Sequence, residues 1–265
     1  MLLKSKVAVI YGGGGVIGGA IARAFAREGA TVWLAGRTSA KVHKVADDIV
    51  AEGGVAHAAT VDALDEDAVE RHAAAVFAES GHIDIAVNAI GLMHVQGKPL
   101  FELSLTEFES PLHGFMRAEF LTAKAAARHM ATNRSGVILT LSTQGAKLAA
   151  PGVLGFGVTC GAIETFSRLL AGELAPSGIR VVCLRSDAIP ETVALGSYAR
   201  DVFQAFADRA NMTLEQMFAP GTSASLLKRY PRLAELAGAA IFAASDHGSA
   251  LNGTVMNLTG GVVIE

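Results

Sequence analysis

The chain has 265 residues, of which 51% are hydrophobic and 18% charged, and its formal net charge at pH 7 is -3. This length suffices for one large domain with a buried core, so we assign residues 1–265 to a single domain. The charge balance gives no basic stripe for nucleic-acid phosphates and no basic segment for a membrane surface, so neither partner is expected. No signal-peptide pattern precedes the first predicted strand, which favours a cytoplasmic protein.

Apolar runs and helical patterns alternate along most of the chain. We predict strands over 7–11, 31–35, 56–60, 84–87, 137–141, 179–184 and 254–258, with helices over 17–28, 40–51, 66–79, 106–132, 154–175 and 232–243. The strands are nearly continuous apolar runs, which is typical of strands buried on both faces of a parallel sheet. The sequence therefore predicts a single-domain α/β fold, a doubly wound Rossmann-type parallel sheet.

Residues 189–231 interrupt this alternation with a stretch rich in polar and aromatic residues, Tyr198 among them. The stretch follows the sixth strand, and ligands bind beyond the carboxyl ends of strands in such sheets. We interpret it as a helical lid over a small-molecule substrate, which we favour over the alternative, a contact between subunits.

A glycine-rich turn lies between the first predicted strand and the first helix. The residues from Gly12 to Gly18 contain Gly-x-Gly-x-x-Gly, and such a turn lets a pyrophosphate approach the N-H groups at a helix N-terminus. The predicted phosphate-binding residues are Gly12, Gly14, Gly15, Val16 and Ile17. The alternative is a glycine-rich turn without a ligand.

The end of the second strand indicates which dinucleotide is bound. An acid at this place suits a free ribose 2′-hydroxyl, whereas a nearby arginine accommodates a 2′-phosphate. Here Gly36 is followed by Arg37, with no acid before Lys41. NADP(H) is therefore preferred, with NAD(H) possible; the alternative is that Arg37 is an ordinary solvated residue.

Several segments in the same order resemble the short-chain dehydrogenase/reductase family over nearly the whole chain. Besides the glycine turn, residues 61–63, 87–91, 162–182 and 258–261 are similar to family motifs, although Val16 replaces a glycine and Thr259 an acid. The resemblance implies that Asp62 and Ala63 contact the adenine, and that Asn88, Ala89 and Ile90 line the cofactor groove. It also implies a homotetramer or homodimer. The predicted long helices 106–132 and 154–175 agree, because each has more apolar surface than one core contact needs.

The family's catalytic positions hold unusual residues in this chain. The resemblance places Thr143 at the serine position, Phe156 at the tyrosine, Cys160 at the lysine and Phe115 at the asparagine. Only Thr143 keeps a hydroxyl, so the usual proton donor and its cationic partner are absent from these positions. The segment around Cys160 also provides no nearby base or cation for a nucleophilic thiol.

We therefore predict an NADP(H)-binding oxidoreductase acting on a small carbonyl, enone or alcohol by a nonstandard proton route. Alternatives are a non-redox enzyme such as a lyase, dehydratase or cyclase on the same scaffold, or a catalytically silent cofactor-binding subunit. Candidates for the missing proton donor, each with a structural alternative, are Tyr198, His94, His113, Lys147 and Asp187. No metal motif is present, and Cys160 and Cys183 lie in apolar stretches that favour buried thiols.

Overall fold

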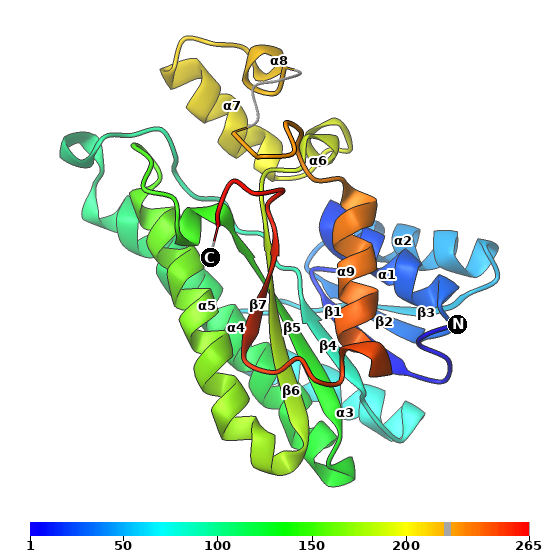
Figure 1. Ribbon diagram of the computed structural model, residues 1–265. Helices are drawn as coiled ribbons and strands as arrows, with labels where there is room; N and C mark the ends of the chain where they lie inside the picture. Colours follow the sequence, from blue (N-terminus) through cyan, green and yellow to red (C-terminus); the bar gives the residue numbers. More distant parts are fainter. Residues whose placement is uncertain (220–223, 265) are drawn as a thin grey trace.

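The computed structural model describes residues 1–219 and 224–264. These residues form a seven-stranded parallel sheet in the order β3-β2-β1-β4-β5-β6-β7 (Figure 1). Its strands are β1 (Val7–Tyr11), β2 (Thr31–Gly36), β3 (Val55–Thr60), β4 (Ile85–Asn88), β5 (Gly136–Thr143), β6 (Ile179–Ser186) and β7 (Thr254–Leu258). The predicted fold class is confirmed.

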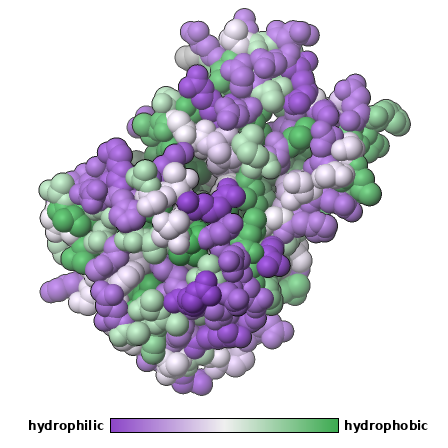
Figure 2. Space-filling model, turned by 180° about the vertical axis from the view of Figure 1, so that it is seen from behind, coloured by the Kyte–Doolittle hydropathy of each residue, from purple (hydrophilic) through white to green (hydrophobic). Residues whose placement is uncertain are grey.

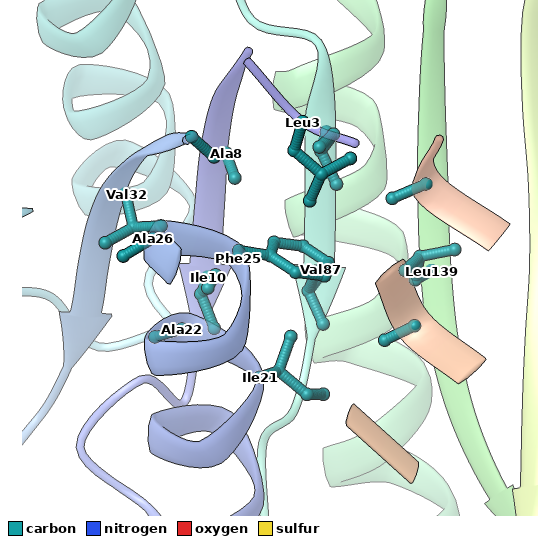
Figure 3. Close-up of a cluster of buried hydrophobic side chains, with 14 of the residues drawn as sticks. Leu3, Ala8, Ile10, Ile21, Ala22, Phe25, Ala26, Val32, Val87 and Leu139 are labelled. Atoms are coloured by element: carbon teal, nitrogen blue, oxygen red, sulfur yellow. The ribbon is translucent and has the colours of Figure 1, made fainter. Parts of the chain in front are cut away.

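Helices cover both faces of the sheet, because the strands carry apolar side chains on both faces and these must be buried. One face carries α1 (Val16–Arg27), α2 (Ser39–Ala51) and α9 (Leu233–Ala244), and the other carries α3 (Glu66–Ser80), α4 (Leu105–Asn133) and α5 (Leu154–Leu174). Figure 3 shows the first core layer, in which Ile21 and Phe25 of α1 lie against side chains of the sheet such as Val87. The two layers fix the sheet as a rigid support for its loops.

The switch in strand order between β3-β2-β1 and β4-β5-β6 positions the ligand site. The chain crosses from β3 back to β4, on the other side of β1, so the loops after β1 and β4 diverge at the carboxyl edge. Residues Ser142 and Thr143, which lie beyond the predicted strand, continue β5 because they pair with Arg185 and Ser186 of β6. This extension carries Thr143 to the same edge as the glycine turn.

The predicted lid region consists of short helices and loops beyond this edge (Figure 1). It contains α6 (Pro190–Ala194), α7 (Ala199–Arg209) and α8 (Leu214–Met217), while 220–223 lie outside the described residues. Seen from behind, the molecule is hollowed beneath this segment (Figure 2). Among the helices of the described residues, none is long and apolar enough to cross a membrane.

Candidate active site

One cavity of about 570 Å³ runs along the carboxyl edge of the sheet, beneath α6 and α7. Its adenosine end, as we name it, is lined by the loops after β1, β2 and β3. Its other end, which we name the chamber, is lined by Leu92, His94, Phe115, Thr143, Phe156, Cys160, Asp187 and Tyr198 together with neighbouring residues. Loops and strand ends far apart in sequence thus form one continuous space.

The glycine turn leaves the N-terminus of α1 open to this cavity. Gly12 adopts a left-handed backbone with φ of 81°, and a Cβ there would overlap the carbonyl of Ala89. Gly15 precedes α1 without any side chain over the helix N-terminus. Gly12, Gly14, Gly15, Val16 and Ile17 all line the cavity, and phosphate binding by them stays a prediction. Unpaired N-H groups and the positive end of the helix dipole are therefore available to an anion such as a pyrophosphate.

The adenosine end carries both basic and acidic groups. Arg37 is exposed directly after β2 and lines the cavity with Lys41. Two further cations at this end, Arg23 and Lys44, are both bound by Asp48, at 2.7 and 3.1 Å. Within the described part of the chain no acid pairs with Arg37 or Lys41, so these two cations remain for a ligand.

Asp62 and Ala63 line the same end, where the resemblance predicted them. The Asp62 carboxylate accepts a hydrogen bond from the Leu64 N-H at 3.0 Å, which holds the loop after β3 in place. Ala89 and Ile90 also line the cavity.

Asn88 has a different place from its neighbours. It is buried, its amide donates to the Thr122 hydroxyl of α4 at 3.1 Å, and its carbonyl accepts from the Ile90 N-H at 3.2 Å. It is outside the cavity lining, so it shapes the loop after β4 from behind.

The chamber brings together the four positions that the resemblance selected. The Thr143 hydroxyl lies 3.3 Å from the Cys160 sulfur and accepts a hydrogen bond from the Gly145 N-H at 3.2 Å. The rings of Phe115 and Phe156 have centroids 6.1 Å apart. Burial raises the pKa of Cys160 despite its contact with Thr143, so at neutral pH this residue is an uncharged thiol.

His94 is held between aromatic rings, an arrangement that sequence patterns do not reveal. Its ring stacks on Phe156 at a centroid distance of 4.0 Å and an angle of 10°, and it meets Phe115 and Tyr198 edge-on. Its Nδ1 lies 2.8 Å from the Leu92 carbonyl, and its Nε2 lies 2.9 Å from the Gln96 amide nitrogen. These partners select the neutral tautomer with hydrogen on Nδ1. Burial also lowers the pKa of His94, so the ring is a poor acid source.

Tyr198 enters the chamber from the loop before α7. Its ring lies directly on the backbone of Gly91, where any Cβ would overlap the ring. Tyr198 lines the cavity, and 37% of the residue is exposed. Burial, with a smaller contribution from Cys160, raises the pKa of Tyr198 to about 12.

The other candidate proton donors differ in position. Asp187, at the end of β6, lines the chamber, and burial raises its pKa although its carboxyl accepts from the Ala188 N-H at 2.6 Å. His113 and Lys147 are exposed and lie outside this cavity. The structure therefore brings Tyr198, His94 and Asp187 to the chamber and leaves the other two candidates outside it.

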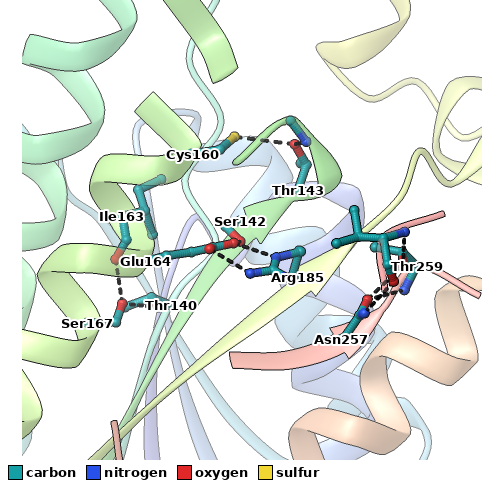
Figure 4. A network of polar contacts seen from close by, with 12 residues as sticks. Thr140, Ser142, Thr143, Cys160, Ile163, Glu164, Ser167, Arg185, Asn257 and Thr259 are labelled. Carbon is teal, nitrogen blue, oxygen red and sulfur yellow. Dashed lines mark hydrogen bonds and ion pairs between the residues drawn. The ribbon is translucent and has the colours of Figure 1, made fainter. Parts of the chain in front are cut away.

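A buried ion pair supports the chamber from below (Figure 4). Arg185 of β6 binds both carboxylate oxygens of Glu164 on α5, at 2.6 and 2.7 Å, and the Ser142 hydroxyl donates to the same carboxylate at 2.7 Å. Glu164 lies one helical turn after Cys160, so this pair fixes the part of α5 that presents Phe156 and Cys160. Sequence reasoning missed it; a charged residue inside each of two largely apolar elements was the available signal.

The site fits a dinucleotide at one end better than at the other. The open glycine turn suits a pyrophosphate, and Arg37 with Asp62 offers polar groups for an adenosine. In the chamber, the short uncharged side chain of Cys160 cannot provide a cationic anchor for the second ribose.

Comparisons with known proteins agree with this geometry. Residues 14–263 match the family model described as "Enoyl-(Acyl carrier protein) reductase". The chain is 28% identical to gluconate 5-dehydrogenase of Gluconobacter oxydans, covering 99% of this chain and 96% of that protein. It is 29% identical to D-threitol dehydrogenase of Mycolicibacterium smegmatis, covering 99% and 95%.

A similar solved structure is that of NAD⁺-bound xylitol dehydrogenase. It has a TM-score of 0.85 and 25% sequence identity and covers 98% of this chain and 100% of that chain. Family model, relatives and structure each match nearly the whole sequence, in agreement with the sheet order and the open glycine turn. The chain therefore belongs to the short-chain dehydrogenase/reductase family.

Proposed function

We propose that this protein is an NADP(H)-dependent oxidoreductase acting on a small carbonyl, enone or alcohol by a nonstandard proton route. The observation that carries the proposal is the continuous cavity from the glycine turn, past Arg37, to the chamber. When bound there, the nicotinamide supplies or accepts the hydride. The similarity to named dehydrogenases supports this reaction class.

The preference for NADP(H) rests on the adenosine end. Arg37 and Lys41 flank the space after β2, and no acidic side chain stands between them. A 2′-phosphate would gain charge-assisted hydrogen bonds from such cations, whereas the residues directly after β2 provide no carboxylate for a free 2′-hydroxyl.

The nonstandard proton route follows from Phe156 and Cys160, which we assign to the family's tyrosine and lysine positions. Among the hydroxyls that line the cavity, we choose those of Thr143 and Tyr198 for the substrate oxygen, because both belong to the chamber as defined above. The Tyr198 phenol stays protonated at neutral pH because its pKa is about 12, so it can donate a hydrogen bond but is a weak acid. We assign Thr143 to orient the carbonyl and Tyr198 to protonate it slowly, with α6 to α8 as the lid that excludes water.

Cofactor binding tests this proposal most directly. We expect NADPH to bind more tightly than NADH, as measured by the change in nicotinamide fluorescence on titration. Replacing Arg37 with Ala should weaken NADPH binding about 10- to 100-fold, the value of one lost charged hydrogen bond, and leave NADH binding nearly unchanged.

Lys228→Ala is the matched control, since it also removes an exposed cation but lies outside the cavity. Equal binding of both cofactors by wild type, unchanged in Arg37→Ala, would contradict the NADP(H) assignment. Product formation without any nicotinamide would contradict the oxidoreductase assignment.

A further inference from the structure

We propose that the chamber accepts a cationic hydride acceptor, an iminium ion on an apolar ring framework, and in reverse oxidises the corresponding tertiary amine. The inference rests on the proposed NADP(H)-dependent hydride transfer and adds a substrate class to the carbonyls, enones and alcohols named there. Three features of the chamber lead to it: its aromatic lining, its charge and the replacement of the family's tyrosine and lysine that we assign to Phe156 and Cys160.

The lining forms a group of four rings, His94, Phe115, Phe156 and Tyr198, which we name the aromatic box. His94 stacks on Phe156 at 4.0 Å, and the Phe115 and Tyr198 rings lie 6.3 and 6.4 Å from His94. The four rings come from the loop after β4, from α4, from α5 and from the loop before α7, and all of them line the cavity, with Phe115 and Tyr198 beside the His94–Phe156 stack. Aromatic faces attract a cation within about 6 Å of the ring centroid, more strongly when water is excluded.

The charge of the chamber also suits a cation. Among the described residues that line the cavity, the cations Arg23, Arg37, Lys41 and Lys44 all belong to the adenosine end. Among the described residues that line the chamber, Asp187 is the one Asp, Glu, Lys or Arg, and the charge that it can carry is negative. His94 is neutral, as its two hydrogen bonds require, and position 160 carries an uncharged thiol. A substrate cation would thus meet an acid and aromatic faces, with no positive group to repel it.

The reduction of an iminium ion does not need the tyrosine and lysine that Phe156 and Cys160 replace in our assignment. Hydride addition to a ketone leaves an alkoxide, which must take a proton from a positioned donor. With an iminium ion, the new C-H bond forms at the carbon while the C=N π pair moves onto nitrogen. The product is a neutral amine, and the positive charge passes from the substrate to the oxidised nicotinamide. Atoms and charge balance without any proton, so a chamber without a tyrosine-lysine pair loses nothing for this substrate.

Binding provides a test that does not depend on turnover. The probes are 2-methylisoquinolinium and isoquinoline, at a pH where isoquinoline is uncharged, titrated by calorimetry into the protein without cofactor, so that no cationic nicotinamide is present. We expect the cation to bind at least tenfold more tightly than the neutral ring. Phe156→Leu should weaken binding of the cation about 5- to 30-fold and weaken binding of the neutral ring much less. Phe242→Leu, on α9 and outside the cavity, is the matched control.

Turnover provides the second test. The protein with NADPH is given either 2-methyl-3,4-dihydroisoquinolinium or 1-tetralone, a ketone of similar shape, and products are measured by mass spectrometry after subtraction of the rate without protein. We expect reduction of the iminium ion at a rate independent of pH across the neutral range, with the ketone at least 100-fold slower.

The outcomes separate this inference from the function on which it rests. Equal affinity for the two isoquinoline probes, or a ketone reduced as fast as the iminium ion, would overturn the inference while tight NADPH binding left the oxidoreductase proposal intact. A protein that bound no NADPH would overturn both.

Discussion

At the scale of single residues, two side chains decide what the chamber can do. Phe156, at the position that we assign to the family's tyrosine, presents a ring stacked on His94, and Cys160 presents a thiol that contacts Thr143. A phenol in this place would need a neighbouring cation to lower its pKa, and position 160 provides none. The groove for the cofactor does not depend on either group.

Restoring both groups tests this interpretation. The double variant Phe156→Tyr/Cys160→Lys should gain ketone reductase activity about 10²- to 10⁴-fold above wild type, because a positioned acid typically contributes that much. The measurement is NADPH oxidation with 1-tetralone. Adding Thr143→Ala to the double variant should remove most of the gain, since the substrate oxygen loses its second hydrogen-bond partner. No gain despite normal NADPH binding would show that these positions do not face the substrate.

At the scale of elements, the ion pair between α5 and β6 fixes the helix that carries Phe156 and Cys160. Arg185 is 1% exposed and Glu164 is also buried, so each charge depends on the other for solvation. Removing one partner of such a pair leaves a buried charge without that compensation, which is far more costly than losing a surface pair.

Glu164→Ala should therefore lower the free energy of unfolding by about 3–5 kcal/mol, measured by urea denaturation. Glu173→Ala, an exposed position on the same helix, is the control and should change stability little. If the two variants were equally stable, the pair would not hold α5 to the sheet.

At the scale of the whole molecule, α4 and α5 leave large apolar side chains in water. Phe120 and Leu169 are 54% and 58% exposed, and Leu105, Leu154 and Val158 are exposed on the same two helices. The two helices pack against each other, and exposed apolar side chains on adjoining helices are expected where subunits join. We propose that these side chains form the homodimer contact within a dimer or tetramer.

Light scattering after gel filtration should accordingly give a mass of two or four chains. Phe120→Asp/Leu169→Asp should shift it toward one chain, because each carboxylate would be buried in the contact. Val50→Asp, equally exposed on α2, should leave the mass unchanged. A wild-type monomer would contradict the proposal.

The sequence alone determined the alternation of strands and helices, the glycine turn and the family, because these features follow from local periodicity and short motifs. It also selected Thr143, Phe156, Cys160 and Phe115, which the structure brings to one chamber, while their catalytic assignment stays a prediction. NADP(H) preference and subunit assembly likewise remain proposals.

Only the tertiary structure decided which side chains meet. It placed Tyr198 on Gly91, stacked His94 on Phe156, paired Glu164 with Arg185, and put Asn88 behind the cavity wall. Local patterns fix the element on which a residue lies. The direction in which each side chain points depends on how the packed layers and loops come together. So does the contact that it makes with a residue distant in the sequence, and no short motif encodes either.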